Sequence, residues 1–124
     1  MKLGESLEDY LECLLVLEKT GKIRSVDVAR TLHVSKPSVN KAMNILKDKG
    51  FISQENYGDI KLTETGRKEA SYVLERHEFL NMFLKDIIKV SEEQAEIDAC
   101  KMEHAISEET FLKLKDYYNH LDNK

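Results

Sequence analysis

Residues 25–51 read SVDVARTLHVSKPSVNKAMNILKDKGF, and this stretch decides the fold. Ser25 is placed to cap a short helix, and His33–Val34 make a turn. Ser35 then caps a second helix with Pro37 in its first turn, where a missing N–H costs nothing. The apolar face of this second helix repeats at helical spacing, with Val39, Ala42, Met43 and Leu46. Two short helices joined by a tight turn are typical of a helix-turn-helix.

The chain after this stretch changes its period. Residues 51–55 and 59–63 alternate between apolar and polar side chains as strands do, and residues 56–58 (NYG) have the composition of a turn. This pattern predicts a short hairpin. A hairpin directly after a helix-turn-helix is the plan of a winged helix-turn-helix.

The rest of the chain has helical periodicity. An amphipathic helix is expected from about Leu7 to Lys19, and a long helix from Thr63 or Thr65 to about Lys85. Two more are expected from Ser91 to about Ala105 and from Ser107 onward, each serine being an N-cap. We therefore predict a mainly α protein, with a winged helix-turn-helix domain over residues 1–66 and a helical second domain over residues 67–124.

Composition favours a globular cytoplasmic protein. Hydrophobic residues make up 41% and charged residues 34% of the 124 residues, and no apolar run is long enough for a membrane span or a signal peptide. Two cysteines, Cys13 and Cys100, do not form a disulfide framework, so we expect free thiols or ligands.

The net charge of −4 is unevenly distributed. Between Lys22 and Lys49 there are seven Lys and Arg residues against two acids, a local charge of +5 that leaves −9 for the remainder. Because local charge matters more than the sum, this basic segment is compatible with binding a nucleic acid.

The polar face of the second short helix carries side chains that can recognise DNA. Serine, asparagine and lysine can pair with base edges, and lysine and arginine near helix ends suit phosphates. The candidate DNA-binding residues are Arg24, Ser35, Lys36, Pro37, Ser38, Asn40, Lys41, Asn44 and Lys47, with Tyr57 on the wing. Any one of them is ordinary on a solvated helix face, but the helix-turn-helix with its hairpin favours DNA binding over a plain interaction module.

Three predicted helices carry residues of the types that bind metals. Cys100, Glu103 and His104 stand at i, i+3 and i+4, so a thiolate, a carboxylate and an imidazole share one helix face. The other candidates are Asp9 and Glu12, one turn apart on the first helix, and His77 on the long helix.

Each of these residues also has a structural interpretation. A histidine on an apolar face is more often a packed core residue than a ligand. Acids in the first turn of a helix interact favourably with its dipole, and a buried cysteine often behaves as a small hydrophobic residue. The group of Cys100, Glu103 and His104 is the strongest single indication of a metal site.

The sequence resembles the DtxR/MntR family, the iron- and manganese-dependent repressors related to the diphtheria toxin repressor. The resemblance runs from about Leu7 to Leu121. It rests on five blocks in family order and spacing, namely residues 8–12 (EDYLE), 34–39 (VSKPSV), 62–66 (LTETG), 76–80 (RHEFL) and 100–107 (CKMEHAIS).

The resemblance implies a homodimer whose second domain dimerises and binds metal, with Mn²⁺ or Fe²⁺ as co-repressor and a palindromic double-stranded DNA operator. By matching positions, it implies the metal ligands Asp9, Glu12, His77, Cys100, Glu103 and His104.

The implied ligands mix two subtypes. Asp9 and Glu12 match manganese-type members. Cys100 matches iron-type members, and a soft thiolate ligand favours iron over manganese. Asn81 and Glu96 stand where iron-type members have an acid and a histidine of an ancillary site. The chain ends near residue 124, as in short members without a C-terminal SH3-like domain.

We therefore expect a metal-dependent DNA-binding repressor of metal homeostasis genes, and not an enzyme. No Gly-rich phosphate loop, nucleophile elbow or pair of Glu-x-x-His motifs is present in the sequence. The alternatives are a winged-helix regulator of a small organic ligand, a metalloenzyme on a helical scaffold, and a dimeric interaction module that does not bind DNA.

Overall fold

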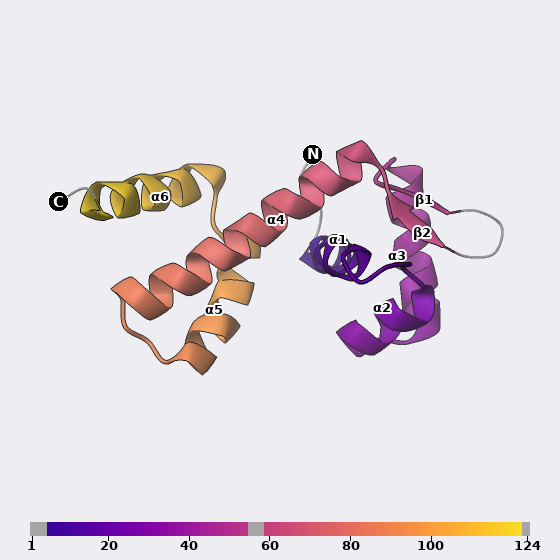
Figure 1. Ribbon diagram of the computed structural model, residues 1–124, viewed down its shortest axis with the longest axis horizontal. Coiled ribbons are helices and arrows are strands. Elements are labelled where there is room, and N and C mark those ends of the chain that lie inside the picture. Colours follow the sequence, from indigo (N-terminus) through magenta and orange to yellow (C-terminus); the bar gives the residue numbers. More distant parts are fainter. Residues whose placement is uncertain (1–4, 55–58, 123–124) are drawn as a thin grey trace. The chain divides into compact units, whose positions relative to one another are not determined.

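A computed structural model of the chain describes residues 5–54 and 59–122 (Figure 1). The chain divides into two compact units, residues 1–72 and residues 73–124. In chain order the elements are α1 (Glu5–Glu18), α2 (Ser25–Leu32), α3 (Lys36–Asp48), β1 (Ile52–Gln54), β2 (Ile60–Leu62), α4 (Glu64–Met82), the π-helical turn η1 (Phe83–Ile87), α5 (Glu92–Ala105) and α6 (Glu108–Asp122). Among these described elements, no helix is both long and apolar enough to cross a membrane.

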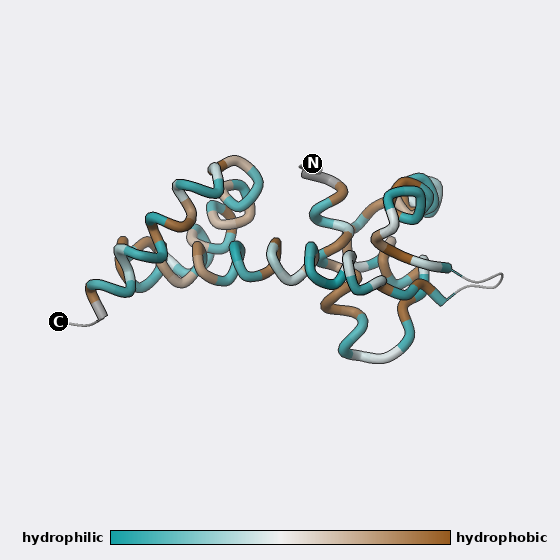
Figure 2. The backbone as a smooth tube through the Cα atoms, turned by 90° about the horizontal axis from the view of Figure 1, so that it is seen from above, coloured by the Kyte–Doolittle hydropathy of each residue, from teal (hydrophilic) through white to brown (hydrophobic). Residues whose placement is uncertain are grey.

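The first unit forms its core from α1, α2 and α3 with the hairpin β1–β2 against them (Figure 1). Apolar residues recur at helical spacing along the helices, as the alternating colours of the tube in Figure 2 show, and many of their side chains are buried. Fully buried ones include Leu11 and Leu14 of α1, Val28 of α2, and Val39, Met43 and Leu46 of α3. Removing these side chains from water is the main contribution that holds the three helices together.

The turn of the helix-turn-helix is set by the conformations of single residues. His33 ends α2 in the left-handed region with φ 56°, and its backbone N–H donates to the Ala29 carbonyl. Ser35 then caps α3, because its side chain accepts a hydrogen bond from the Ser38 N–H at 3.2 Å. Pro37 lies in the first turn of α3, as predicted.

The prediction that Ser25 caps α2 is wrong. Ser25 is already the first helical residue, and the N-cap position belongs to Arg24, whose backbone is extended and whose side chain makes no capping hydrogen bond. The reason lies one residue earlier, where the Ile23 carbonyl accepts a hydrogen bond from the Ile60 N–H at 3.0 Å. This bridge to the hairpin keeps residues 23 and 24 extended, so the helix begins directly after them.

The predicted hairpin is confirmed. Strands β1 and β2 are antiparallel, and Ile52 pairs with Leu62, Ser53 with Lys61 and Gln54 with Ile60. The isoleucine and leucine side chains of these pairs are buried against the helices, whereas Ser53 and Lys61 are exposed. The turn residues 56–58, with Tyr57 among them, lie outside the described residues.

The start of α4 is fixed against the end of α3. The Thr63 hydroxyl donates to the Gly50 carbonyl at 2.7 Å and accepts from the Gly66 N–H at 3.0 Å. Gly66 approaches the backbone so closely that a Cβ at this position would lie 1.9 Å from the Phe51 carbonyl oxygen. Only glycine fits here, because a backbone atom cannot move aside as a flexible side chain can.

An ion pair connects the end of α1 to the first turn of α4. The Arg67 guanidinium donates to both carboxylate oxygens of Glu18, at 3.1 and 2.7 Å. This bidentate interaction raises the pKa of Arg67, mainly through the hydrogen bond itself and then through the charge of Glu18. The ends of α1 and α3 and the beginnings of β1 and α4 therefore meet around one point.

The second unit contains the C-terminal part of α4 with η1, α5 and α6. Phe79 contacts Phe83, Phe111 and Tyr118, with ring centroids 5.6 to 6.0 Å apart. The Arg76 guanidinium lies over Phe111 and donates to the Ile106 carbonyl at 2.6 Å, so it supports both α6 and the end of α5. Phe111 and Tyr118 meet Phe79 edge to face, and ring pairs of this kind add to the stability that burial alone provides.

The helix ends of the second unit largely follow the sequence. Ser91 caps α5 by accepting from the Gln94 N–H, and Ser107 caps α6 by accepting from the Thr110 N–H. The long helix differs in one respect, because regular α-helix ends at Met82 and the chain continues as the π-helical turn η1. Lys89, with φ 69°, then redirects the backbone toward α5.

Candidate functional site

The outer face of α3 carries the predicted DNA-reading side chains. Val39, Ala42, Met43 and Leu46 are buried, which leaves the opposite face of the helix to solvent. The predicted residues Arg24, Ser35, Lys36, Pro37, Ser38, Asn40, Lys41, Asn44 and Lys47 are all exposed. Three of them are lysines, so the exposed face of the helix is polar and basic, as contact with a phosphate backbone requires.

In the second unit, a buried carboxylate lies among imidazoles. The Glu103 side chain on α5 is only 1% exposed. Its Oε1 lies 3.1 Å from His77 Nδ1 and 3.8 Å from His104 Nε2. Its Oε2 is buried and has no hydrogen-bond partner among the described residues. Because a buried charge is costly unless it is compensated, this oxygen marks a place suited to a cation.

His77 lies between two carboxylates, one at each ring nitrogen. On the side of Nδ1 is Glu103, and on the side of Nε2 is Glu96 Oε1 at 2.9 Å. The imidazole is 13% exposed, and the Glu96 side chain is 59% exposed. The ring is therefore held from both edges by residues of α5.

Cys100 and His104 are two further candidate ligands on α5. Their ligand atoms lie within 4.8 Å of each other, and the His104 side chain is 4% exposed. Cys100 is exposed and is not part of a disulfide bond in the described part of the chain. The i, i+3, i+4 spacing therefore does bring the α5 candidates together, with His77 of α4 beside Glu103.

Asp9 and Glu12 belong to the first unit. They lie one turn apart on α1, and both are half-buried. Their neighbour Cys13 is buried, and burial raises the pKa of its thiol to about 11, with a smaller contribution from the charge of Glu12. Cys13 is therefore a protonated core residue, whereas Cys100 is exposed.

Glu96 is the residue of the site that sequence reasoning did not propose. It lies one helical turn before Cys100 and two before Glu103 on α5, so the same spacing rule that grouped Cys100, Glu103 and His104 also places Glu96 on their face. Its contact with His77 could not be read from the sequence, because it depends on how α5 packs against α4.

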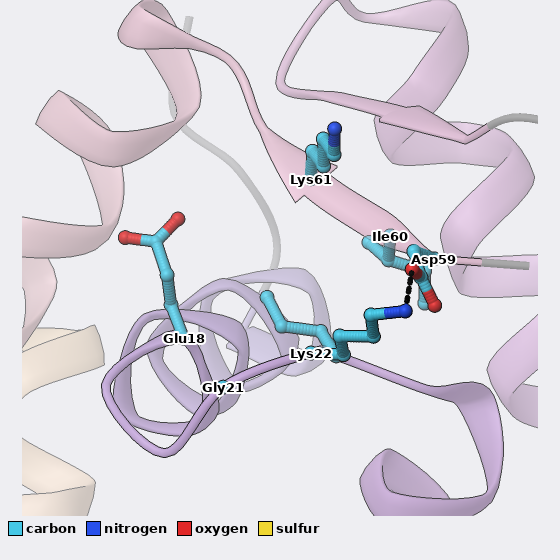
Figure 3. A pocket seen from close by; sticks show the side chains of 7 residues that line it. Glu18, Gly21, Lys22, Asp59, Ile60 and Lys61 are labelled. Carbon is cyan, nitrogen blue, oxygen red and sulfur yellow. Dashed lines mark ion pairs between the residues drawn. The ribbon is translucent and has the colours of Figure 1, made fainter.

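A groove of about 360 Å³ opens in the first unit, between the end of α1 and the start of β2 (Figure 3). Three of its charged side chains have partners within the unit. Lys22 reaches Asp59 at 3.5 Å, and Glu18 is held by Arg67. Figure 3 shows Glu18 turned away from the Lys22–Asp59 pair. We therefore interpret the groove as the boundary where α1 packs beside the wing, and not as a binding site.

These features define a class of protein. A helix-turn-helix with a two-stranded wing and an exposed basic recognition helix is the architecture of winged-helix DNA-binding proteins, and the second unit adds a buried carboxylate–imidazole cluster suited to a metal.

The chain belongs to the iron-dependent repressor (DtxR/MntR) family. Residues 2–60 match the family's N-terminal DNA binding domain, and residues 63–124 match its metal binding and dimerisation domain. It is thus a metal-dependent transcriptional regulator and not an enzyme, and its family domains imply a DNA operator and a homodimer, in agreement with the expectation from the sequence.

Relatives at 32% and 40% identity support this assignment. An uncharacterized HTH-type transcriptional regulator of Methanocaldococcus jannaschii is 32% identical over 124 residues, which cover 98% of this chain and 99% of the relative. The transcriptional regulator MntR of Salmonella typhimurium is 40% identical over 108 residues, which cover 86% of this chain and 68% of the relative.

Solved structures share the fold. The metal-dependent transcriptional regulator MtsR superposes with a TM-score of 0.83 at 24% identity over 91% of this chain and 53% of that one. The manganese-activated repressor ScaR, in its apo form, superposes with a TM-score of 0.76 at 26% identity over 89% and 53%. The chain spans about half the length of these solved structures.

Proposed function

We propose that this protein is a cytoplasmic repressor of metal homeostasis genes that binds a palindromic operator when Mn²⁺ or Fe²⁺ is bound. In this proposal residues 1–66 act as the DNA-binding domain and residues 67–124 as the dimerisation and metal-binding domain. The second unit exposes large apolar side chains that a dimer interface would bury. They are Ile88, Ile97, Leu112 and Tyr117.

The proposed DNA contacts follow from the exposed face of α3. Ser38, Asn40, Lys41 and Asn44 would face base edges in the major groove, where their donors and acceptors can discriminate sequence. Arg24, Lys36 and Lys47 would hold phosphates, and Ser35 and Pro37 lie at the α3 N-terminus, where the helix dipole favours a phosphate. Tyr57 is proposed to contact the backbone from the wing.

The observation that carries the metal proposal is the buried Oε2 of Glu103, which has no partner in the described part of the chain. A carboxylate, two imidazoles and a thiolate are ligand types that first-row divalent metals accept, so the residues present fit such an ion. The proposed ligands are Asp9, Glu12, His77, Cys100, Glu103 and His104.

A bound divalent cation would give the buried Glu103 carboxylate a positively charged partner. Asp9 and Glu12 would add two further carboxylates from the first unit. Ligands drawn from both units would couple ion binding to DNA affinity, and a coupling of about 2–3 kcal/mol would give a useful switch.

The choice between the two ions rests on opposing features. Cys100 offers a soft thiolate that favours iron, whereas Asp9 and Glu12 offer the hard oxygen ligands that manganese prefers. The fold similarity to ScaR, a manganese-activated repressor, supports including Mn²⁺ in the proposal. We keep both ions in the proposal and test them side by side.

The proposal is tested by selecting DNA fragments with the full-length protein under anaerobic conditions, in parallel with Mn²⁺, with Fe²⁺ and with a chelator. We expect a palindromic site to be enriched only when metal is present. The more effective ion then identifies the physiological co-repressor.

The matched control is Glu103→Gln, which keeps the size of the side chain but removes its charge. We expect this variant to stay folded and to lose the metal-dependent enrichment. Equal enrichment with metal and chelator would contradict the metal switch and favour a regulator of another ligand. If no DNA site is enriched under any of the three conditions, an interaction module that does not bind DNA would be favoured.

A further inference from the structure

The contacts of His77 assign different roles to the two carboxylates beside it. Glu103 faces Nδ1 at 3.1 Å and is almost completely buried. Glu96 faces Nε2 at 2.9 Å and is largely exposed. The two nitrogens lie on opposite edges of the imidazole, so the two carboxylates cannot act on the same nitrogen.

A neutral imidazole has one protonated nitrogen, which donates, and one bare nitrogen, which accepts or binds metal. A metal ligand must present the bare nitrogen to the ion, and the hydrogen bond made by the other nitrogen decides which one is bare. Glu103 faces Nδ1 through Oε1, and its Oε2 is buried with no hydrogen-bond partner among the described residues, so the cation belongs on the Nδ1 side.

We propose that Glu96 is a positioning residue for the metal centre. Its carboxylate accepts a hydrogen bond from Nε2–H of His77, which fixes this tautomer and directs the Nδ1 lone pair toward the ion. The inference rests on the proposed function, because it takes His77 as a ligand. It goes further by giving a role to a residue outside the proposed ligand set.

The exposure of Glu96 explains why it suits this role. Its side chain is solvated, and a carboxylate acceptor makes a stronger hydrogen bond to the ring than a neutral acceptor does. This bond also increases the electron density on the imidazole and so makes Nδ1 a better ligand. Glu96 begins the α5 face that continues with Cys100 and Glu103, so one helix carries both the positioning residue and the ligands.

The experiment compares Glu96→Ala, Glu96→Gln and the control Glu93→Ala in the full chain without DNA. Glu93 is also an exposed acid in α5, so its removal reports the effect of losing one negative charge. Because Glu96 is exposed, its variants should fold. Mn²⁺ affinity and stoichiometry are measured by calorimetry, and the ring of His77 is observed by ¹⁵N NMR with Cd²⁺ as a diamagnetic probe.

We expect Glu96→Ala to weaken Mn²⁺ binding about 10- to 100-fold, the usual effect of losing a partner behind a metal-ligating histidine. Glu96→Gln should fall between Glu96→Ala and the wild type, because its amide oxygen still accepts but carries no charge. Glu93→Ala should stay close to the wild type. In the wild type loaded with Cd²⁺, Nδ1 of His77 should carry the metal and Nε2 the proton.

Three results would overturn the inference. The first is wild-type Mn²⁺ affinity in Glu96→Ala, and the second is coordination of Cd²⁺ through Nε2 of His77. The third is the loss of one ion from the stoichiometry of Glu96→Ala, which would make Glu96 a ligand of a second ion, together with the buried amide oxygen of Asn81. Failure of the wild type to bind Mn²⁺ or Fe²⁺ would instead contradict the proposed function.

Discussion

At the scale of single residues, the two cysteines show how environment decides chemistry. Cys13 is buried in α1, and its thiol is protonated because burial raises its pKa to about 11. Cys100 is exposed on α5 and lies close to His104. Since the thiolate is the reactive form, only Cys100 combines access with a suitable position for metal or oxidant chemistry.

We expect alkylation to distinguish the two thiols. In the native, metal-free protein at pH 8, iodoacetamide should modify Cys100 and leave Cys13 unmodified, whereas in urea both should react. Mn²⁺ or Fe²⁺ should slow the modification of Cys100 if the thiolate is a ligand. Peptide mass spectrometry measures both sites, and rapid native labelling of Cys13 would contradict its buried position.

The raised pKa of Cys13 also predicts a pH dependence of stability. The unfolded chain loses this proton near its ordinary pKa of about 9, whereas the folded chain keeps it until about 11. The contribution of Cys13 is therefore complete below pH 9 and is lost as the pH rises through 11. The fall in melting temperature between pH 9 and 11 should be smaller in Cys13→Ala than in the wild type.

At the scale of elements, the junction around Gly66 connects the recognition helix, the wing and α4. Thr63 and Gly66 hold the first turn of α4 against Gly50 and Phe51 through backbone groups rather than long side chains. Such a junction tolerates little change, because main-chain atoms in close contact have no alternative rotamer to adopt.

We expect Gly66→Ala to destabilise the protein by about 1–3 kcal/mol, in the range of overpacked sites, because its Cβ would overlap the Phe51 carbonyl oxygen. The control Thr65→Ala changes an exposed position next to it and should stay within about 0.5 kcal/mol of the wild type. Urea unfolding followed by circular dichroism measures both. A Gly66→Ala midpoint equal to that of Thr65→Ala would refute the close contact.

Helix ends show which element boundaries the sequence predicts well. Ser35, Ser91 and Ser107 are N-caps as expected, because a short side-chain oxygen next to free N–H groups decides such an end locally. The prediction for Ser25 was wrong, because the bridge between Ile23 and Ile60 decides that end from far along the chain. Local chemistry predicts a boundary only where no distant strand competes for the same backbone.

At the scale of the whole molecule, each unit has its own proposed task. The net positive segment between Lys22 and Lys49 lies in the first unit. Glu103 and the two histidines beside it lie in the second unit. DNA contact and metal contact should therefore be separable by substitution, even though the proposed function couples them.

We expect Lys41→Ala to weaken metal-dependent operator binding about 5- to 150-fold if Lys41 reads a base, or to reduce the salt slope by about 1 if it holds a phosphate. Its Mn²⁺ affinity without DNA should be unchanged. The matched control is Lys113→Ala, which removes an exposed lysine from α6 and should affect neither property. Equal losses of DNA and metal affinity in Lys41→Ala would contradict the separation of tasks.

The sequence by itself determined the order of the helices, the hairpin, the buried face of α3 and the shared face of Cys100, Glu103 and His104, because these depend on short-range periodicity. Only the tertiary structure decided that Glu103 is buried with one oxygen lacking a partner in the described chain, and that Glu96 holds the far edge of His77. It also decided that Gly66 must be glycine. The physical reason is that burial and contact between distant segments depend on how the helices pack, which local spacing does not specify.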